Sequence, residues 1–206
     1  MTSGPGPDTD ELPAAAIRLL VARGMTVAAA ESLTGGLVTA ALTTVPGASA
    51  VVRGGVVAYA ADLKCALLGV DTGLLARVGT VHQDVALAMA RGVRERLGAS
   101  VGVATTGVAG PDPADGQPVG TVHIAVSTSR LARHVALMLG GDRAGIRRGT
   151  VDHVLQLLVA TLNEDEPEGG GSGTEGGGAG PGGGAAGTEG GGAGPGGGAA
   201  DTHGRQ

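Results

Sequence analysis

The only lysine of the chain, Lys64, follows the only tyrosine, Tyr59, by five residues, in the stretch VVAYAADLKCALLGV at positions 56–70. All thirteen other basic side chains are arginines. An arginine effectively never loses its proton in a protein, whereas a desolvated lysine can become a neutral base. The stretch therefore indicates a neutral base or a proton donor at Lys64, with Tyr59 at the same edge of a sheet. The alternative is a half-buried tyrosine beside a solvated surface lysine, and spacing alone leaves both open.

A second candidate site is the motif ESLTGG at residues 31–36, which follows a short buried strand and precedes a helix. Backbone N–H groups of residues 34–36 would face outward without partners, and such groups at a helix start attract anions such as phosphate. Ser32 would lie at the carboxyl end of the strand, where open α/β sheets usually bind ligands. Ser32 could instead cap the helix, an interpretation that spacing alone favours. The motif matches neither a P-loop nor a GxSxG elbow.

Two further segments could contribute to a site. The loop TTGVAGPD, residues 105–112, follows an apolar strand, and its hydroxyls could bind a substrate amide or ribose or simply close a turn. The last helix begins near three arginines, Arg143, Arg147 and Arg148. One of them could clamp a phosphate, or all three could be exposed and pair with nearby acids for little energy.

Composition argues against several classes of function. The five histidines contain no pair at i, i+4 spacing and the chain has one cysteine, so we expect no metal site and no cofactor. No Gly-x-Gly-x-x-Gly motif follows the first strand, which argues against dinucleotide binding. Phe and Trp are absent, and residues 1–166 carry 13 basic against 15 acidic side chains, so we expect no nucleic-acid partner.

The same composition predicts a cellular compartment. No apolar run reaches the roughly 20 residues of a membrane helix, and the acidic N-terminus is unlike a secretory signal. Cys65 has no second cysteine with which to form a disulfide, which suits a reducing environment. We therefore predict a soluble cytoplasmic protein with no membrane partner.

The chain divides into three parts by composition. Residues 1–9 are expected to be a flexible N-terminus, 10–165 a single domain, and 166–206 a disordered tail rich in glycine, alanine and proline. The tail contains a 14-residue tandem repeat, because GTEGGGAGPGGGAA at 173–186 recurs at 187–200. It has no apolar residue larger than alanine, so ordering it would cost backbone entropy without burying a core.

Within the domain, strands and helices alternate before a late hairpin, which predicts a three-layer α/β/α domain with a mixed, mostly parallel sheet. Ile17, Leu20 and Val21 are expected on the buried face of the first helix. We expect strands at 25–30, 54–60 and 100–107, a hairpin turning at 127–129, and helices from Asp8 or Asp10 to Gly24, at 34–44, 62–68, 72–78 and 83–97, and from 142 onward. The last helix should bury Val151, Val154, Leu155, Leu158 and Leu162.

Together these motifs resemble the CinA C-terminal domain family, which includes the nicotinamide mononucleotide deamidases. The resemblance covers roughly residues 10–162. It rests on AESLTGG (30–36), the Tyr59 to Lys64 pair leading into LLGV (67–70), TTGVAGPD (105–112), PVGTVHIAV (118–126) and GDR followed by RR (141–148), in that order.

The resemblance implies metal-free hydrolysis of the amide of nicotinamide mononucleotide to nicotinic acid mononucleotide and ammonia, in pyridine nucleotide salvage. Ser32 matches the proposed nucleophile, Lys64 the residue that activates it, and Tyr59 the accompanying tyrosine; a neutral lysine could take the proton of the serine. The implied substrate site comprises Glu31, Thr34, Gly35, Gly36, Thr106, Gly107 and Arg143. The implied partners are the nucleotide and further copies of the chain, as a homo-oligomer.

The chain departs from the family pattern beside this site. Many members have a polar pair after the tyrosine, where this chain has Ala60 and Ala61, and many have a serine where this chain has Thr106. The larger N-terminal domain of long CinA proteins is not expected in this chain. The alternative function is a catalytically silent module that binds a nucleotide or a protein partner, with the two alanines as signs of lost activity.

Overall fold

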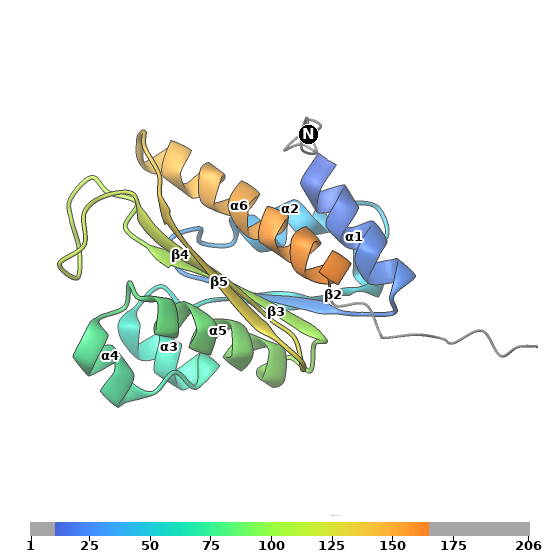
Figure 1. The fold of residues 1–206 in the computed structure, drawn as a ribbon, viewed down its shortest axis with the longest axis horizontal. Helices are drawn as coiled ribbons and strands as arrows, with labels where there is room; N and C mark the ends of the chain where they lie inside the picture. The colour runs from blue at the N-terminus through green and yellow to red at the C-terminus, as the bar shows by residue number, and fades with distance from the viewer. Residues whose placement is uncertain (1–10, 165–206) are drawn as a thin grey trace, which may run out of the picture. The chain divides into compact units, whose positions relative to one another are not determined.

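The computed structural model describes residues 11–164, which form a five-stranded sheet between two layers of helices (Figure 1). The expected flexible N-terminus and the Gly-rich tail lie outside the described residues. The strands are β1 (Val27–Glu31), β2 (Val52–Val57), β3 (Val101–Gly107), β4 (Thr121–Ser127) and β5 (Ala132–Met138). The helices are α1 (Leu12–Ala22), α2 (Leu37–Thr43), the 3-10 turn η2 (Ala48–Ala50), α3 (Ala61–Leu68), α4 (Thr72–Val78), α5 (Gln83–Arg96) and α6 (Arg143–Glu164).

The sheet has the strand order β2-β1-β3-β4-β5. β1 pairs in parallel with both β2 and β3, whereas the β3–β4 and β4–β5 pairings are antiparallel. The expected mixed sheet is confirmed, with the two kinds of pairing equal in number. From β1 the chain continues to β2 on one side of the sheet, and from β3 it continues to β4 on the other side. The direction in which strands are added to the sheet therefore changes between β1 and β3. Open α/β sheets bind ligands at such a point.

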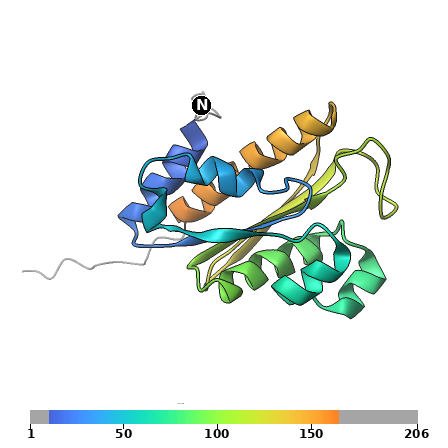
Figure 2. The same cartoon turned by 180° about the vertical axis from the view of Figure 1, so that it is seen from behind.

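Each face of the sheet is covered by its own group of helices. α1, α2 and α6 lie on one face and α3, α4 and α5 on the other, as both views of the ribbon show (Figures 1 and 2). Two separate apolar cores follow from this arrangement. The first contains Leu12, Leu20, Val38, Leu42, Val103, Ile124, Val154 and Leu158, and the second contains Leu68, Val85, Met89, Val93 and Ala104.

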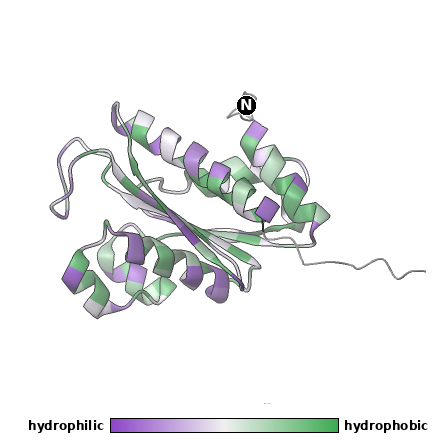
Figure 3. Ribbon diagram, in the orientation of Figure 1, coloured by the Kyte–Doolittle hydropathy of each residue, from purple (hydrophilic) through white to green (hydrophobic). Residues whose placement is uncertain are grey.

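The apolar periodicity of the helices decides which side is buried. Hydrophobic and hydrophilic residues alternate along α6 (Figure 3), and the five residues expected on its inner face are all buried. In α1 the expectation was partly wrong, because Val21 is 53% exposed while Ile17 and Leu20 are buried. At 100° per residue Val21 lies beyond the stripe formed by Leu12, Ala16 and Leu20, so it faces outward.

Two element boundaries differ from the expected ones where they bear on the site. Helix α2 begins at Leu37 rather than near residue 34, because Gly35 and Gly36 have φ values of 60° and 100°, which a helix cannot contain. Strand β2 ends at Val57, opposite the last residue of β1, so Tyr59 lies in the loop that follows. Glu11 occupies the N-cap position of α1, and the predicted caps Asp8 and Asp10 lie outside the described residues.

A glycine fixes the position of the helix that carries Lys64. A Cβ atom at Gly92 of α5 would overlap the carbonyl oxygen of Leu68, the last residue of α3. Helices α3 and α5 can therefore approach each other closely only because position 92 lacks a side chain. Between residues 11 and 164, no helix is both long and apolar enough to span a membrane.

Candidate active site

The three parallel strands end together and place their following residues side by side. Glu31, the last residue of β1, aligns with Val57 of β2 and Thr105 of β3. Two backbone hydrogen bonds continue the pairing past the strand ends, from Ser32 N to the Thr105 oxygen (3.0 Å) and from Ala58 N to the Glu31 oxygen (2.9 Å). Segments that are far apart in sequence are thereby held at one edge of the sheet.

Ser32 and Lys64 meet at this edge. The Lys64 Nζ atom lies 3.1 Å from Ser32 Oγ and donates to the carbonyl oxygen of Ala58 at 2.8 Å and, more weakly, to that of Tyr59 at 3.5 Å. Lys64 is 1% exposed and Ser32 8%. The solvated surface lysine considered from the sequence is therefore excluded, and so is Ser32 as a helix cap, because the N-cap of α2 is Gly36.

Burial lowers the pKa of the Lys64 amine from its usual value of 10.5, and the charges of Asp115 and Cys65 oppose that shift. A neutral amine has two N–H bonds and one lone pair. The two carbonyl oxygens of Ala58 and Tyr59 can accept both N–H bonds, which leaves the lone pair for the hydroxyl of Ser32. This arrangement can remove the proton of a serine and so make it a nucleophile.

A pocket of about 130 Å³ opens in front of this pair. It is lined by Ser32, Leu33, Tyr59, Thr80, Val81, Gly107, Ala109, Ala114, Asp115 and Arg143. At its rim Arg143 donates to the Tyr59 hydroxyl (2.8 Å) and to the Gly110 carbonyl oxygen (2.6 Å). Both Tyr59 and Arg143 are exposed, so an anionic ligand could reach the guanidinium.

The three arginines of the last helix have different places. Arg143 lines the pocket, as above. Arg147 donates from Nε to the carbonyl oxygen of Leu33 (2.9 Å) and from Nη2 to that of Thr34 (2.7 Å), so it fixes the backbone that follows Ser32. Arg148 lies outside the pocket, in a separate groove. Of the three, Arg143 is therefore the one placed to contact a ligand beside Ser32.

The expected anion site at the start of α2 is filled by the protein itself. Glu31 is 1% exposed, and its carboxylate accepts hydrogen bonds from Gly36 N (2.8 Å), Val38 N (3.0 Å), Thr39 N (2.8 Å) and Thr39 Oγ1 (2.7 Å). Of the three N–H groups expected to be unpaired, that of Gly36 is bonded to Glu31 and that of Gly35 donates to the Ser32 carbonyl oxygen at 3.1 Å, so the expectation was wrong for these two. Glu31 faces α2 and not the pocket, so its expected contact with substrate is replaced by a role in holding the helix.

The other expected site residues fall into two groups. Gly107 lines the pocket, and Gly35 and Gly36 form the turn between Ser32 and α2. The side chains of Thr34 and Thr106 are buried away from the pocket. Thr34 Oγ1 is hydrogen-bonded to Thr105 Oγ1 at 2.8 Å, and Thr106 Oγ1 donates to the Thr80 carbonyl oxygen at 2.7 Å. Both hydroxyls therefore have partners within the protein, which explains why neither lines the pocket.

Sequence reasoning missed Thr80 and Asp115, which both line the pocket. The Asp115 carboxylate accepts from Thr80 N (2.6 Å) and from Thr80 Oγ1 (2.5 Å). One signal was available, because Asp115-Gly116 is a dipeptide typical of two-residue hairpin turns. That signal predicts the turn, whereas the contact with Thr80 depends on how the turn packs.

Histidines also gather near this region without forming a metal site. His123 Nδ1 lies 2.9 Å from His134 Nε2, and His82 caps α5. Within residues 11–164, no group of three or more His, Cys, Asp or Glu side chains is arranged to hold a metal ion.

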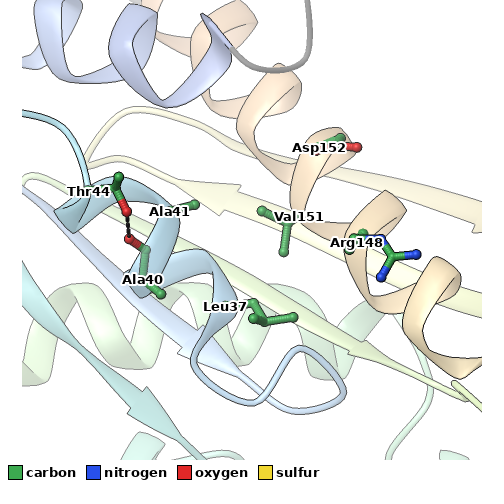
Figure 4. Close-up of a pocket in the computed structure, with 7 residues that line it drawn as sticks. All are labelled: Leu37, Ala40, Ala41, Thr44, Arg148, Val151 and Asp152. Carbon is green, nitrogen blue, oxygen red and sulfur yellow. Dashed lines mark hydrogen bonds between the residues drawn. The ribbon is translucent and has the colours of Figure 1, made fainter.

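A larger groove of about 440 Å³ lies between α2 and α6 (Figure 4). Its floor is apolar, from Leu37, Ala40 and Val151, and its rim includes Arg148. Its other polar residues are Asp152 and Thr44, whose hydroxyl donates to the Ala40 carbonyl oxygen at 2.8 Å, and none of its lining residues is a lysine or a serine. We therefore assign the candidate active site to the smaller pocket, where Ser32 lies beside the Lys64 amine.

Known proteins resemble the chain over the same region. Residues 9–162 match the family model described as the CinA C-terminal domain. A CinA-like protein from Frankia casuarinae is 50% identical over 153 residues, which cover 74% of this chain and 35% of that protein. A putative competence-damage inducible protein from Desulforamulus reducens is 46% identical over 140 residues, covering 68% and 34%. The aligned region thus spans about a third of these curated relatives.

Solved structures are similar over almost their whole length. The competence/damage inducible protein CihA from Agrobacterium tumefaciens superposes with a TM-score of 0.73 and 41% identity, covering 79% of this chain and 99% of that one. The competence damage-inducible protein A from Klebsiella pneumoniae superposes with a TM-score of 0.75 and 31% identity, covering 77% and 99%. The α/β/α architecture is therefore that of these proteins.

Proposed function

Because this chain belongs to the CinA C-terminal domain family, we propose that it hydrolyses the amide of nicotinamide mononucleotide to nicotinic acid mononucleotide and ammonia. One observation carries the proposal: the buried Lys64 amine lies 3.1 Å from the Ser32 hydroxyl, at the mouth of a pocket. Burial of an ammonium is costly, so it lowers the pKa of Lys64 and favours the neutral amine that a base requires.

The reaction proceeds in two halves. Lys64 takes the proton of Ser32 while Oγ bonds to the amide carbon, and the resulting tetrahedral intermediate expels the nitrogen, which leaves as ammonia with the proton from Lys64. A water molecule, deprotonated by the same amine, then attacks the ester on Ser32. The carbon–Oγ bond breaks, the carboxylic acid is released, and Ser32 regains its proton from Lys64.

The size of the pocket limits how the substrate is held. Sites that enclose a whole drug-sized ligand have volumes of about 300–1,000 Å³, whereas this pocket has about 130 Å³. The amide and its ring would enter the pocket, and the ribose phosphate would remain at the rim. There the Arg143 guanidinium donates hydrogen bonds to the Tyr59 hydroxyl and the Gly110 carbonyl oxygen. A hydrogen bond to the phosphate would replace one of these two.

The departures from the family pattern do not disturb this arrangement. Ala60 and Ala61 are exposed at the start of α3 and are not part of the pocket lining. Thr106 is bonded to the backbone of Thr80, so it supports the pocket wall from behind. Catalysis by Ser32 and Lys64 is therefore compatible with all three substitutions.

The test is ammonia release from nicotinamide mononucleotide by the purified protein and by Ser32→Ala. We expect the variant to lose about a thousandfold or more in kcat, the usual cost of losing one member of a nucleophile–base pair. Ser129→Ala, which changes an exposed serine between β4 and β5, is the matched control and should keep full turnover. Protein that binds the nucleotide but releases no ammonia would instead support the catalytically silent module.

Lys64→Arg tests the base itself. Arginine keeps the positive charge but cannot release a proton near neutral pH, so we expect turnover to fall by orders of magnitude. Circular dichroism spectra measured beside the assay show whether the fold is retained. Normal turnover in a folded Lys64→Arg protein would remove the general-base role from Lys64.

A further inference from the structure

Two segments far apart in sequence meet at one side of the candidate pocket. One is the loop after β3, whose tip is a two-residue hairpin turn: Ala114 and Gln117 exchange backbone hydrogen bonds of 3.2 and 2.8 Å around Asp115 and Gly116. Both turn residues have positive φ, 51° and 70°, as a type I′ turn requires. The other segment is the stretch before α5, which contributes Thr80 and Val81 to the pocket wall.

The Asp115 carboxylate joins these two segments. Its Oδ2 atom accepts from the Thr80 backbone N–H at 2.6 Å and from the Thr80 hydroxyl at 2.5 Å. These bonds, together with one from the Val81 N–H, hold the pKa of the Asp115 carboxyl below its usual value, so the group is charged near neutral pH. Hydrogen bonds to an ionised acceptor are stronger than neutral ones.

We propose that Asp115 is a positioning residue for the reaction proposed above: it fastens the turn after β3 to the segment before α5 and so closes the pocket in front of Ser32 and Lys64. The inference rests on the proposed function for its catalytic meaning. Its geometric basis is that Thr80, Val81, Ala114 and Asp115 all line the same pocket as Ser32. Without the carboxylate, the turn loses its two hydrogen bonds from Thr80.

A turn residue alone would not need the carboxylate. Asparagine forms type I′ turns before glycine at least as well as aspartate. Asp115→Asn therefore preserves the turn while removing the charge, and it separates the proposed role from a purely conformational one. Asp62→Asn is the matched control, because Asp62 is also an exposed aspartate, lies two residues before Lys64 and is not part of the pocket lining.

The carboxylate also acts on Lys64 through its charge. Its negative charge favours the ammonium form and so raises the pKa of Lys64 against the larger, opposite effect of burial. The other titratable or charged groups near this amine are Cys65 on the same helix and, at the rim of the pocket, Tyr59 and Arg143. Removing the charge of Asp115 must therefore lower the pKa of Lys64 further.

The first measurement is the pH profile of kcat/KM for nicotinamide mononucleotide. We expect Asp115→Asn to lose roughly tenfold or more in kcat/KM, the size typical of losing charge-assisted hydrogen bonds. The acid limb, where activity falls because Lys64 becomes protonated, should move to lower pH. Asp62→Asn should match the unmodified protein in both respects.

The second measurement needs no turnover. Because Lys64 is the only lysine, protein grown with ¹³C-labelled lysine gives one Cε signal, whose chemical shift follows the protonation of the amine with pH. The midpoint should fall in Asp115→Asn and stay in place in Asp62→Asn. A kcat/KM of Asp115→Asn equal to that of the control overturns the proposal. If the unmodified protein releases no ammonia, the proposed function fails, whereas a midpoint that falls only in Asp115→Asn still places the carboxylate near the amine.

Discussion

Replacing Glu31 by glutamine should destabilise the protein rather than weaken substrate binding. The Glu31 carboxylate is almost fully buried and accepts four hydrogen bonds from the first turn of α2. Its Oε2 atom serves the N–H groups of Gly36 and Val38, and its Oε1 atom serves the N–H and the hydroxyl of Thr39. It thereby satisfies donors that a helix start otherwise leaves unpaired.

The size of the effect follows from which donors lose their acceptor. An amide NH₂ in place of Oε2 would face two N–H groups at once, so the glutamine should turn its NH₂ towards Thr39. There the hydroxyl can rotate and accept, but the Thr39 N–H is left without a partner. One unpaired buried donor, together with the lost charge at a helix N-terminus, should cost about 2–3 kcal/mol. Glu31→Ala loses all four bonds and should cost about 4 kcal/mol or more.

Urea unfolding at neutral pH, followed by circular dichroism, measures these costs as changes in the free energy of unfolding. The control is Glu95→Gln, because Glu95 is an exposed carboxylate 3.2 Å from Arg94, and such pairs are worth less than about 1 kcal/mol. The reasoning would be refuted by a Glu31→Gln protein of unchanged stability whose KM for the nucleotide is raised. That result would return Glu31 to the substrate site.

Three further outcomes are expected. Between the lowered pKa of Lys64 and 10.5 only the unfolded chain binds the lysine proton, so the free energy of unfolding of the unmodified protein should rise by about 1.4 kcal/mol per pH unit. Lys64→Met should lose this rise, and parallel stability profiles of the two proteins would contradict the reasoning. A chain ending at Glu166 should keep its melting temperature and turnover in calorimetry and ammonia assays, because residues 167–206 have no apolar side chain larger than alanine, and a large loss of either would show that the tail docks. Exhaustive chelation should leave ammonia release unchanged, and loss of activity restored by Zn²⁺ would favour a metal-activated water.

The sequence predicted the elements whose evidence is local and periodic. The helix at 72–78 has the expected bounds, and the apolar spacing of α6 identifies its buried face. The start of α2 could not be predicted in the same way. It depends on two glycines in left-handed conformations and on a carboxylate that reaches back from the preceding strand, and neither feature has a periodic signal.

For the site, the residue types were visible but their contacts were not. The lone lysine and the ESLTGG motif made Lys64 and Ser32 candidates, but spacing alone left the surface lysine and the helix cap open as alternatives. Asp115 and Thr80 are 35 residues apart and come from segments without repeating patterns. Their bond exists only because the turn after β3 and the segment before α5 lie on the same side of the pocket, which is a property of the assembled fold.

The choice of lysine at position 64 follows from the space that the fold leaves for it. The Lys64 Nζ atom lies between the carbonyl oxygen of Ala58, at 2.8 Å, and the hydroxyl of Ser32, at 3.1 Å. The whole residue is only 1% exposed. A guanidinium is planar, carries five donors and remains charged, so it would bring more N–H groups than this enclosure has acceptors. Helix α3 is also packed closely against α5 at Gly92, where a side chain would overlap the backbone of Leu68. Lys64→Arg should therefore remove the base and strain the site together.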